Sequence, residues 1–257
     1  YAMEPGQLIS SLWTLTQLLY KHYGQKAIIL IDEYDVPLDK AFENNYYNEM
    51  IILLRNMLEQ SLKTNDNLYM AVLTGCLRIA RDSIFTGLNN FNIFSITDQY
   101  FDEYFGFTDK EVKEILQYYK VPEAFEQTKK WYDGYRFGNT DIYCPWDVIN
   151  HCKALKVDKE AIPQPYWINT SGNYIIKRFI EKANQQTRRE IEQLIEGKAI
   201  NKEIRLELTY NELDNTIENL WSVLFATGYL TQQGKPQGRT YSLTIPNESI
   251  RQIFIEQ

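Results

Sequence analysis

Two short apolar runs with a helical segment between them constrain this chain more than any other feature. The runs are KAIILI, residues 26–31, and NLYMAVLTG, residues 67–75. Near-continuous apolar strands are typical of parallel sheets, in which both faces of a strand are buried. NEMIILLRNMLEQSLK, residues 48–63, has apolar residues at helical spacing. Strand, helix and strand in this order predict a parallel βαβ unit, and therefore an α/β fold with a doubly wound sheet.

The segments on either side of this unit carry further signals. Leucines at helical spacing over residues 8–19 predict a helix that ends at Gly24. FNIFSITD, residues 91–98, predicts a weaker third strand. Thr108 and Glu111 stand at the spacing of a capping box, in which each satisfies the backbone amide of the other. The predicted secondary structure therefore changes after about residue 107, from strands with helices between them to helices.

The last third predicts a helix, a hairpin and a closing helix. An apolar helix over residues 217–226 is followed by the strand candidates GYLTQ and TYSLTI, with a loop containing Gly and Pro between them. Asn247 is placed to cap the closing helix. This order predicts a winged-helix-like domain. Because Lys235 and Arg239 are the bases of the wing, we expect a structural or protein-contacting domain rather than a DNA reader.

Composition excludes several classes of function. The 257 residues carry a net charge of −7 without a long basic run, which argues against a protein that coats nucleic acid or anionic lipid.

There is no apolar stretch of about 18 residues and no leader pattern, so neither a membrane span nor a signal peptide is expected. Three widely spaced cysteines are typical of a reduced compartment. The sequence predicts a soluble, cytoplasmic protein.

An acid cluster follows the first apolar run. Ligands of open α/β sheets bind at the carboxyl ends of the strands, and Asp32 and Glu33 stand at that end of the first strand. An apolar run followed by Asp-Glu is the Walker B pattern of nucleotide hydrolases. Asp32 would hold the water shell of Mg²⁺, and Glu33 would polarise the water that attacks the γ-phosphate of ATP. Thr74 ends the second strand, where a sensor 1 residue would present its hydroxyl beside the same phosphate.

Other interpretations of these residues remain open. Arg78 and Arg81 could neutralise charge on a γ-phosphate, or they could lie on an exposed helical turn. The acids could form only the polar rim of a strand, or they could be ligands in a metal-dependent nuclease, although the second run offers no further acid or lysine. The motif G-x-x-x-x-G-K-S/T is absent from the 257 residues, so this sequence contains no P-loop.

Several longer motifs resemble the predicted AAA-ATPase family of bacteria and archaea, whose members resemble P-loop ATPases of the signal-transducing, STAND-like type. The resemblance runs nearly end to end and rests on LIDEYDVPL, LTGCLRIARDSIFTGLNNF, FGFTDKEV, WYDGYRFG with IYCPWDV, and GYLT with YSLTIPNESIR.

The resemblance implies a P-loop NTPase-like parallel sheet, here partial, over residues 1–107. A helical lid over 108–165 and a winged-helix-like domain over 166–257 would follow. By similarity Asp32 and Glu33 are the Walker B pair and Thr74 is sensor 1, while Arg78 or Arg81 would contact the γ-phosphate. Pro145 resembles the lid proline that packs on adenine. The cofactors implied are ATP and Mg²⁺.

Two functions follow from this reading. One is an ATP-hydrolysing switch that controls an effector directed at nucleic acid, since family members often carry a C-terminal PD-(D/E)xK nuclease-like domain. The other is a catalytically inactive scaffold that keeps the ATPase shape and binds a protein partner or itself.

Overall fold

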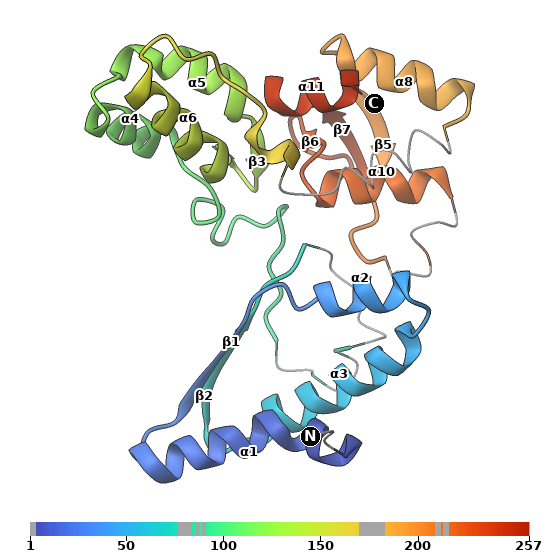
Figure 1. Cartoon of the computed structure of the whole chain (residues 1–257). Helices are drawn as coiled ribbons and strands as arrows, with labels where there is room; N and C mark the ends of the chain where they lie inside the picture. Colours follow the sequence, from blue (N-terminus) through green and yellow to red (C-terminus); the bar gives the residue numbers. More distant parts are fainter. Residues whose placement is uncertain are drawn as a thin grey trace. The chain divides into compact units, whose positions relative to one another are not determined.

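The computed structural model describes residues 4–76, 84–85, 88, 91–169, 183–208, 212 and 216–256. The chain divides into two compact units (Figure 1). The first comprises residues 1–93 with 206–214, and the second comprises 94–205 with 215–257. Each unit is described by itself. The boundaries predicted at residues 107 and 165 stay predictions.

The first unit contains the predicted βαβ arrangement. Its elements are α1 (Pro5–Tyr23), β1 (Ala27–Ile31), α2 (Val36–Glu43), α3 (Tyr47–Leu62) and β2 (Leu68–Leu73). β1 and β2 pair in parallel, with Ile28 opposite Met70 and Ile31 opposite Leu73. Gly24 ends α1 in the left-handed conformation, as predicted, with φ of 66°. The α/β prediction is therefore confirmed for this unit as a mixed fold with a small parallel sheet.

Only one face of this sheet is covered in the residues that the structure describes. α1 packs against α3, and both helices contact the strands, while the amide of Asn65 donates to the hydroxyl of Thr16 at 3.0 Å. The other face presents four apolar side chains to solvent: Ile28, Leu30, Met70 and Val72 are 56%, 73%, 43% and 43% exposed. The prediction that both faces are buried is wrong for the chain as it stands, because burial depends on neighbouring elements as well as on strand composition.

The second unit begins with helices around an apolar core. They are α4 (Asp109–Tyr118), η1 (Pro122–Ala124), α5 (Phe125–Tyr132) and α6 (Pro145–Val157), and the hairpin of β3 (Tyr135–Phe137) and β4 (Thr140–Ile142) lies between α5 and α6 in the chain. The predicted capping box is confirmed, since Thr108 accepts from the backbone of Glu111 and the Glu111 carboxylate accepts from the backbone of Thr108. The core contains Val112, Leu116, Tyr132, Tyr143, Val148 and Cys152.

The rest of the second unit is built on a small antiparallel sheet. Its elements are η2 (Tyr166–Asn169), α8 (Gln185–Ile195), β5 (Ile200–Glu203), α10 (Ile217–Ala226), β6 (Thr231–Gln232), β7 (Thr240–Thr244) and α11 (Glu248–Glu256). The strand order is β5-β7-β6. The predicted helix, hairpin and helix correspond to α10, β6, β7 and α11. β5 was not predicted, because INKE lacks the apolar alternation of a strand.

The third strand predicted over residues 91–98 is wrong. This segment is irregular and ends in a turn in which the backbone amide of Ser95 donates to the Asp98 carboxylate at 2.7 Å. Ile93 and Phe94 are 42% and 46% exposed. A side chain that accepts from the backbone amide three residues before it competes with strand pairing for that amide, so the apolar alternation alone did not make a strand.

Two motifs far apart in the sequence pack against each other in the second unit. Gly134 of WYDGY has φ of 99°, and a Cβ built on it would lie 2.1 Å from the carbonyl oxygen of Pro246. Asn247 donates to the carbonyl oxygen of Asp133 at 2.9 Å and accepts from the backbone amide of Ile250 at 3.1 Å. The predicted cap at Asn247 is therefore confirmed, and the same side chain ties α11 to the end of α5.

Among the residues described by the structure, no helix is both long enough and apolar enough to cross a bilayer.

Candidate functional site

The parallel pairing of β1 and β2 brings the predicted site residues Asp32 and Thr74 together. Ile31 and Leu73 are partners in register, so the residues that follow them lie side by side at the carboxyl edge of the sheet. The Thr74 hydroxyl donates to Oδ1 of Asp32. Backbone bonds extend the pairing, since Thr74 donates to Ile31 and Tyr34 donates to Thr74, both at 2.9 Å. Two of the predicted residues, 42 positions apart in the sequence, are therefore in contact at this point.

Glu33 adopts a backbone conformation that L-residues seldom take. Its φ is 52°, and its backbone amide donates to the Thr74 hydroxyl at 3.4 Å. A non-glycine residue in the left-handed region costs about 1 kcal/mol or more, and such residues cluster at functional sites. The exposed Glu33 carboxylate follows Asp32 directly, so the local turn places an acid beside the Asp32–Thr74 pair.

Asp35, the third acid of the cluster, has a structural role. It is only 5% exposed, and its Oδ2 accepts from the backbone amide of Cys76 at 2.9 Å. Gly75 permits this approach, because a Cβ there would lie 2.7 Å from the Tyr34 ring and 2.9 Å from Oδ1 of Asp35. Asp35 and Gly75 therefore hold the two strand ends together, a role that spacing alone did not reveal.

The field at this edge of the sheet is negative. Burial raises the pKa of the Cys76 thiol, and the charges of Asp35, Glu33 and Asp32 raise it further. A thiol held in its protonated form is a poor nucleophile, so Cys76 is not a candidate for covalent catalysis. The same field favours a cation.

The residues at the strand ends suit Mg²⁺ better than a transition metal. No group of three or more His, Cys, Asp or Glu in the described ranges is arranged to hold a metal ion. Mg²⁺ needs no such group, because it is commonly bound through one or two protein oxygens together with waters and substrate phosphates. The Asp32 carboxylate and the Thr74 hydroxyl are oxygen donors of this kind.

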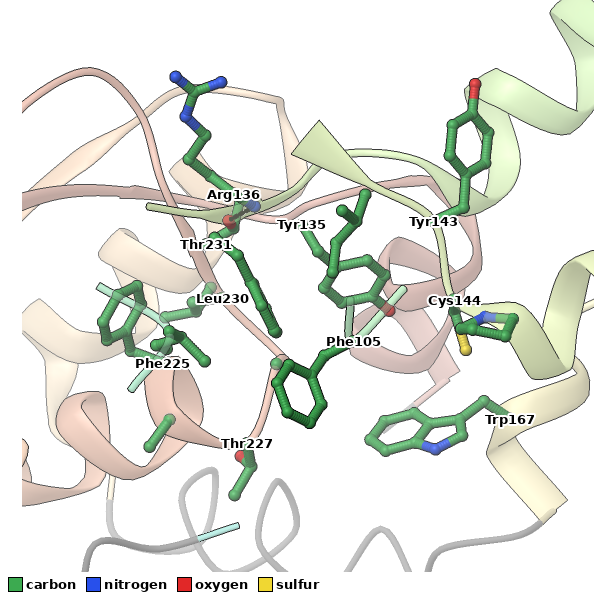
Figure 2. A pocket seen from close by; sticks show the side chains of 16 residues that line it. Phe105, Tyr135, Arg136, Tyr143, Cys144, Trp167, Phe225, Thr227, Leu230 and Thr231 are labelled. Atoms are coloured by element: carbon green, nitrogen blue, oxygen red, sulfur yellow. Dashed lines mark hydrogen bonds between the residues drawn. The ribbon is translucent and has the colours of Figure 1, made fainter. Parts of the chain in front are cut away.

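The remaining predicted residues are Arg78, Arg81 and Pro145. Arg78 and Arg81 lie outside the described residues. Pro145 lies in the second unit at the first turn of α6, where it helps to line a pocket of about 230 Å³. Aromatic rings dominate this pocket (Figure 2), including those of Phe105, Tyr135 and Trp167.

Several polar groups around the pocket are already engaged. The Thr231 hydroxyl accepts from the backbone amide of Arg136 at 2.8 Å, and the Thr227 hydroxyl donates to the carbonyl of Val223 at 2.7 Å. Arg136 pairs with Asp141 at 3.0 Å. Figure 2 shows the Arg136 side chain directed away from the rings. An apolar, aromatic pocket of this kind suits a flat ring.

Two buried titratable residues of α6 were also not predicted as a pair. Asp147 and His151 are one turn apart, and both are fully buried. Burial raises the pKa of Asp147 to about 6, and the Cys144 thiol and the backbone of Trp167 offset only part of this effect. Burial lowers the pKa of His151 to about 4. Polar residues at positions i and i+4 on an otherwise apolar helix face were the available sequence signal.

Comparison with known proteins gives a match of part of the chain to a family model, and an uncharacterised relative. Residues 2–85 match the AAA-ATPase-like family model, which is described as a predicted AAA-ATPase. An uncharacterised protein encoded in the vnfD 5' region of Azotobacter chroococcum mcd 1 is 28% identical over 152 residues, which is 57% of this chain. The matched part spans only 27% of that relative. No solved structure matches the chain.

Proposed function

We propose that this chain, which is AAA-ATPase-like over residues 2–85, is part of an ATP-binding and ATP-hydrolysing switch protein. The observation that carries the proposal is the contact between Thr74 and Asp32 at the carboxyl edge of a parallel sheet, with Glu33 beside it in a strained conformation. A strand edge with one fixed carboxylate, one fixed hydroxyl and one exposed acid supplies part of the groups needed for hydrolysis of a phosphoanhydride, those that position the metal ion and the attacking water.

Each residue has a distinct role in this proposal. Asp32 would hold the water shell of Mg²⁺, which would neutralise phosphate charge, and Thr74 would present its hydroxyl beside the γ-phosphate as sensor 1. Glu33 orients a water molecule and accepts its proton as the γ-phosphate is attacked. The hydrogen bond from Thr74 keeps the Asp32 carboxylate in one orientation, so the carboxylate does not need to reorient during the reaction.

The proposal needs a phosphate-binding loop from the rest of the protein. The 257 residues contain no G-x-x-x-x-G-K-S/T motif, and a curated relative extends well beyond the part that matches. Contact of Pro145 with adenine, a γ-phosphate role for Arg78 or Arg81, and a winged-helix-like domain that relays closure to a nucleic-acid-directed effector are further parts of the proposal. They rest on the family resemblance.

Glu33→Gln tests the central role. In the complete protein this variant is expected to bind ATP with unchanged affinity and to hydrolyse it about 100-fold more slowly or worse, because removal of a general base costs about 10²-fold to 10⁴-fold. The measurement is single-turnover hydrolysis of radiolabelled ATP, together with equilibrium binding.

Glu43→Gln is the matched control, because Glu43 is an exposed acid of the same unit that pairs with Lys40 at 2.8 Å. It is expected to leave hydrolysis unchanged. Hydrolysis at the parental rate in Glu33→Gln would remove Glu33 from the mechanism. Failure of the complete parental protein to bind ATP at all would favour the catalytically inactive scaffold.

A further inference from the structure

Four aromatic side chains of the second unit lie together at its surface, and they are called the aromatic patch below. They are Phe94, Tyr100, Phe101 and Tyr104, which are 46%, 72%, 50% and 80% exposed. The ring centroid of Phe101 lies 5.1 Å from that of Phe94, 6.4 Å from that of Tyr100 and 6.1 Å from that of Tyr104. Phe101 also has φ of 66°, a conformation that L-residues seldom adopt and that is enriched at functional sites. Exposed apolar side chains are normal singly, whereas a contiguous group is typical of an interaction site.

Hydrogen bonds hold the backbone beneath the aromatic patch in place. The carbonyl oxygen of Ile96 accepts from the amide of Gly138 at 2.9 Å, and the Asp102 carboxylate accepts from the amide of Asn139 at 3.1 Å. Gly138 lies at the turn of the β3–β4 hairpin, where a Cβ would be 2.5 Å from the carbonyl oxygen of Asp98. The hairpin therefore fixes the segment that carries the rings. A surface that is already ordered loses less conformational entropy when a partner binds.

The charge of this segment is negative. Residues 94–105 contain three acids and no Lys, Arg or His, and Glu103 is exposed. In the hairpin that contacts the segment, Arg136 is paired with Asp141 at 3.0 Å. Aromatic rings do stack on nucleic acid bases, but proteins that bind nucleic acid bring basic side chains to the phosphates. The acids therefore favour a cationic partner over one that carries phosphates.

A guanidinium group matches both the rings and the acids. A cation is attracted to the face of an aromatic ring. Arginine combines this contact with hydrogen bonds to carboxylates in one plane, which lysine does not do as well. We propose that the aromatic patch, together with Glu103, binds an arginine-containing segment of a partner protein. This interaction needs no nucleotide and does not depend on the proposed ATP hydrolysis.

A synthetic peptide that alternates Gly and Arg over about nine residues is the probe. Peptides with Lys or Glu in place of Arg are its controls. Binding to the 257-residue chain is measured by fluorescence anisotropy of a dye on the peptide, at physiological salt without nucleotide. The Arg peptide is expected to bind at least threefold more tightly than the Lys peptide, because the guanidinium group stacks on the rings and also pairs with carboxylates. The Glu peptide is expected to show no binding.

Substitutions locate the binding surface. Tyr100→Ser and Tyr104→Ser are each expected to weaken binding of the Arg peptide about threefold, and about tenfold together, since each removes one exposed cation–π contact. Tyr118→Ser is the matched control, because Tyr118 is 82% exposed on α4 of the same unit. Glu103→Gln is also expected to weaken binding, and Glu123→Gln, at an exposed acid of η1, is its control.

Several results would overturn the proposal. They are no binding of the Arg peptide, equal affinity for the Arg and Lys peptides, and an equal loss of affinity in Tyr104→Ser and Tyr118→Ser. Tighter binding of a single-stranded DNA oligonucleotide would overturn it in favour of nucleic acid. Self-association of the chain that Tyr104→Ser abolishes would do so in favour of a second copy. A urea midpoint that falls more in Tyr104→Ser than in Tyr118→Ser would show that the rings are packed within the chain, which would also overturn the proposal.

Discussion

Replacement of Gly134 with Ala is expected to lower the free energy of unfolding by about 4 kcal/mol. The φ of 99° at this residue is unfavourable for any side chain, at a cost of about 1 to 3 kcal/mol. The new Cβ would also lie 2.1 Å from the carbonyl oxygen of Pro246. Because that atom belongs to the backbone, it cannot rotate away, and overpacking of this kind costs a further 1 to 3 kcal/mol or so.

Gly234→Ala separates the two contributions. Gly234 also has a positive φ, 71°, but nothing lies within 4 Å of a Cβ built there. It is therefore expected to show the backbone strain without the clash, and to cost about 1 kcal/mol. Urea unfolding followed by circular dichroism measures both variants. Equal losses in the two variants would show that the approach of Gly134 to Pro246 is not a tight contact in solution.

Asp147→Asn is expected to stabilise the protein by up to about 3 kcal/mol at pH 7. Burial raises the pKa of Asp147 from 3.8 to about 6. The folded state therefore binds a proton more tightly than the unfolded state, and ionisation of the carboxyl at neutral pH works against folding. A pKa difference of this size means that ionisation of the buried carboxyl costs about 3 kcal/mol of stability at pH 7. Asn does not ionise, so the variant avoids this cost. Asp158→Asn, at an exposed residue at the end of the same helix, is the control.

The pH dependence of the variant follows from His151. Burial lowers the pKa of His151 from 6.5 to about 4, so its contribution to stability is complete above pH 6.5 and is lost as the pH falls to 4. Asp147 acts in the opposite direction, because its unfavourable ionisation disappears over pH 6 to 3.8. The two effects nearly cancel, so these two residues together are expected to change the unfolding free energy of the parental protein little over this pH range.

Asp147→Asn removes the compensation. Its unfolding free energy is expected to fall by about 3 kcal/mol between pH 7 and pH 4. Urea midpoints at half-unit pH intervals measure the profile. A variant that is no more stable than the parental protein at pH 7, or that loses no additional stability in acid, would show that the Asp147 carboxyl is hydrated in solution.

Local signals predicted those features that depend on neighbours in the sequence. The end of α1 at Gly24, the capping box of Thr108 and the cap at Asn247 all follow from hydrogen bonds within a few residues. The partnership of β1 and β2 was also predictable, because an apolar run, a helix and a second apolar run have one common arrangement. That arrangement put Asp32 beside Thr74.

Contacts between distant segments were not predictable in the same way. Asp35 resembled the other acids of its cluster in sequence, and its burial and its bond to the Cys76 amide separate its role from theirs. The strand expected at residues 91–98 failed for a local reason instead, because the Asp98 carboxylate accepts from the backbone amide of Ser95, three residues before it, and apolar alternation does not show this competition.

Local patterns in the sequence were enough to predict α1, α3, α10 and α11, the parallel pair of strands and the residues at the strand ends, since these depend on apolar periodicity and on local hydrogen bonds. The exposed face of the sheet, the approach of Gly134 to Pro246 and the burial of Asp147 and His151 became visible in the folded chain alone. The physical reason is that burial, close approach and a shifted pKa depend on atoms contributed by distant parts of the chain, which a local pattern does not specify.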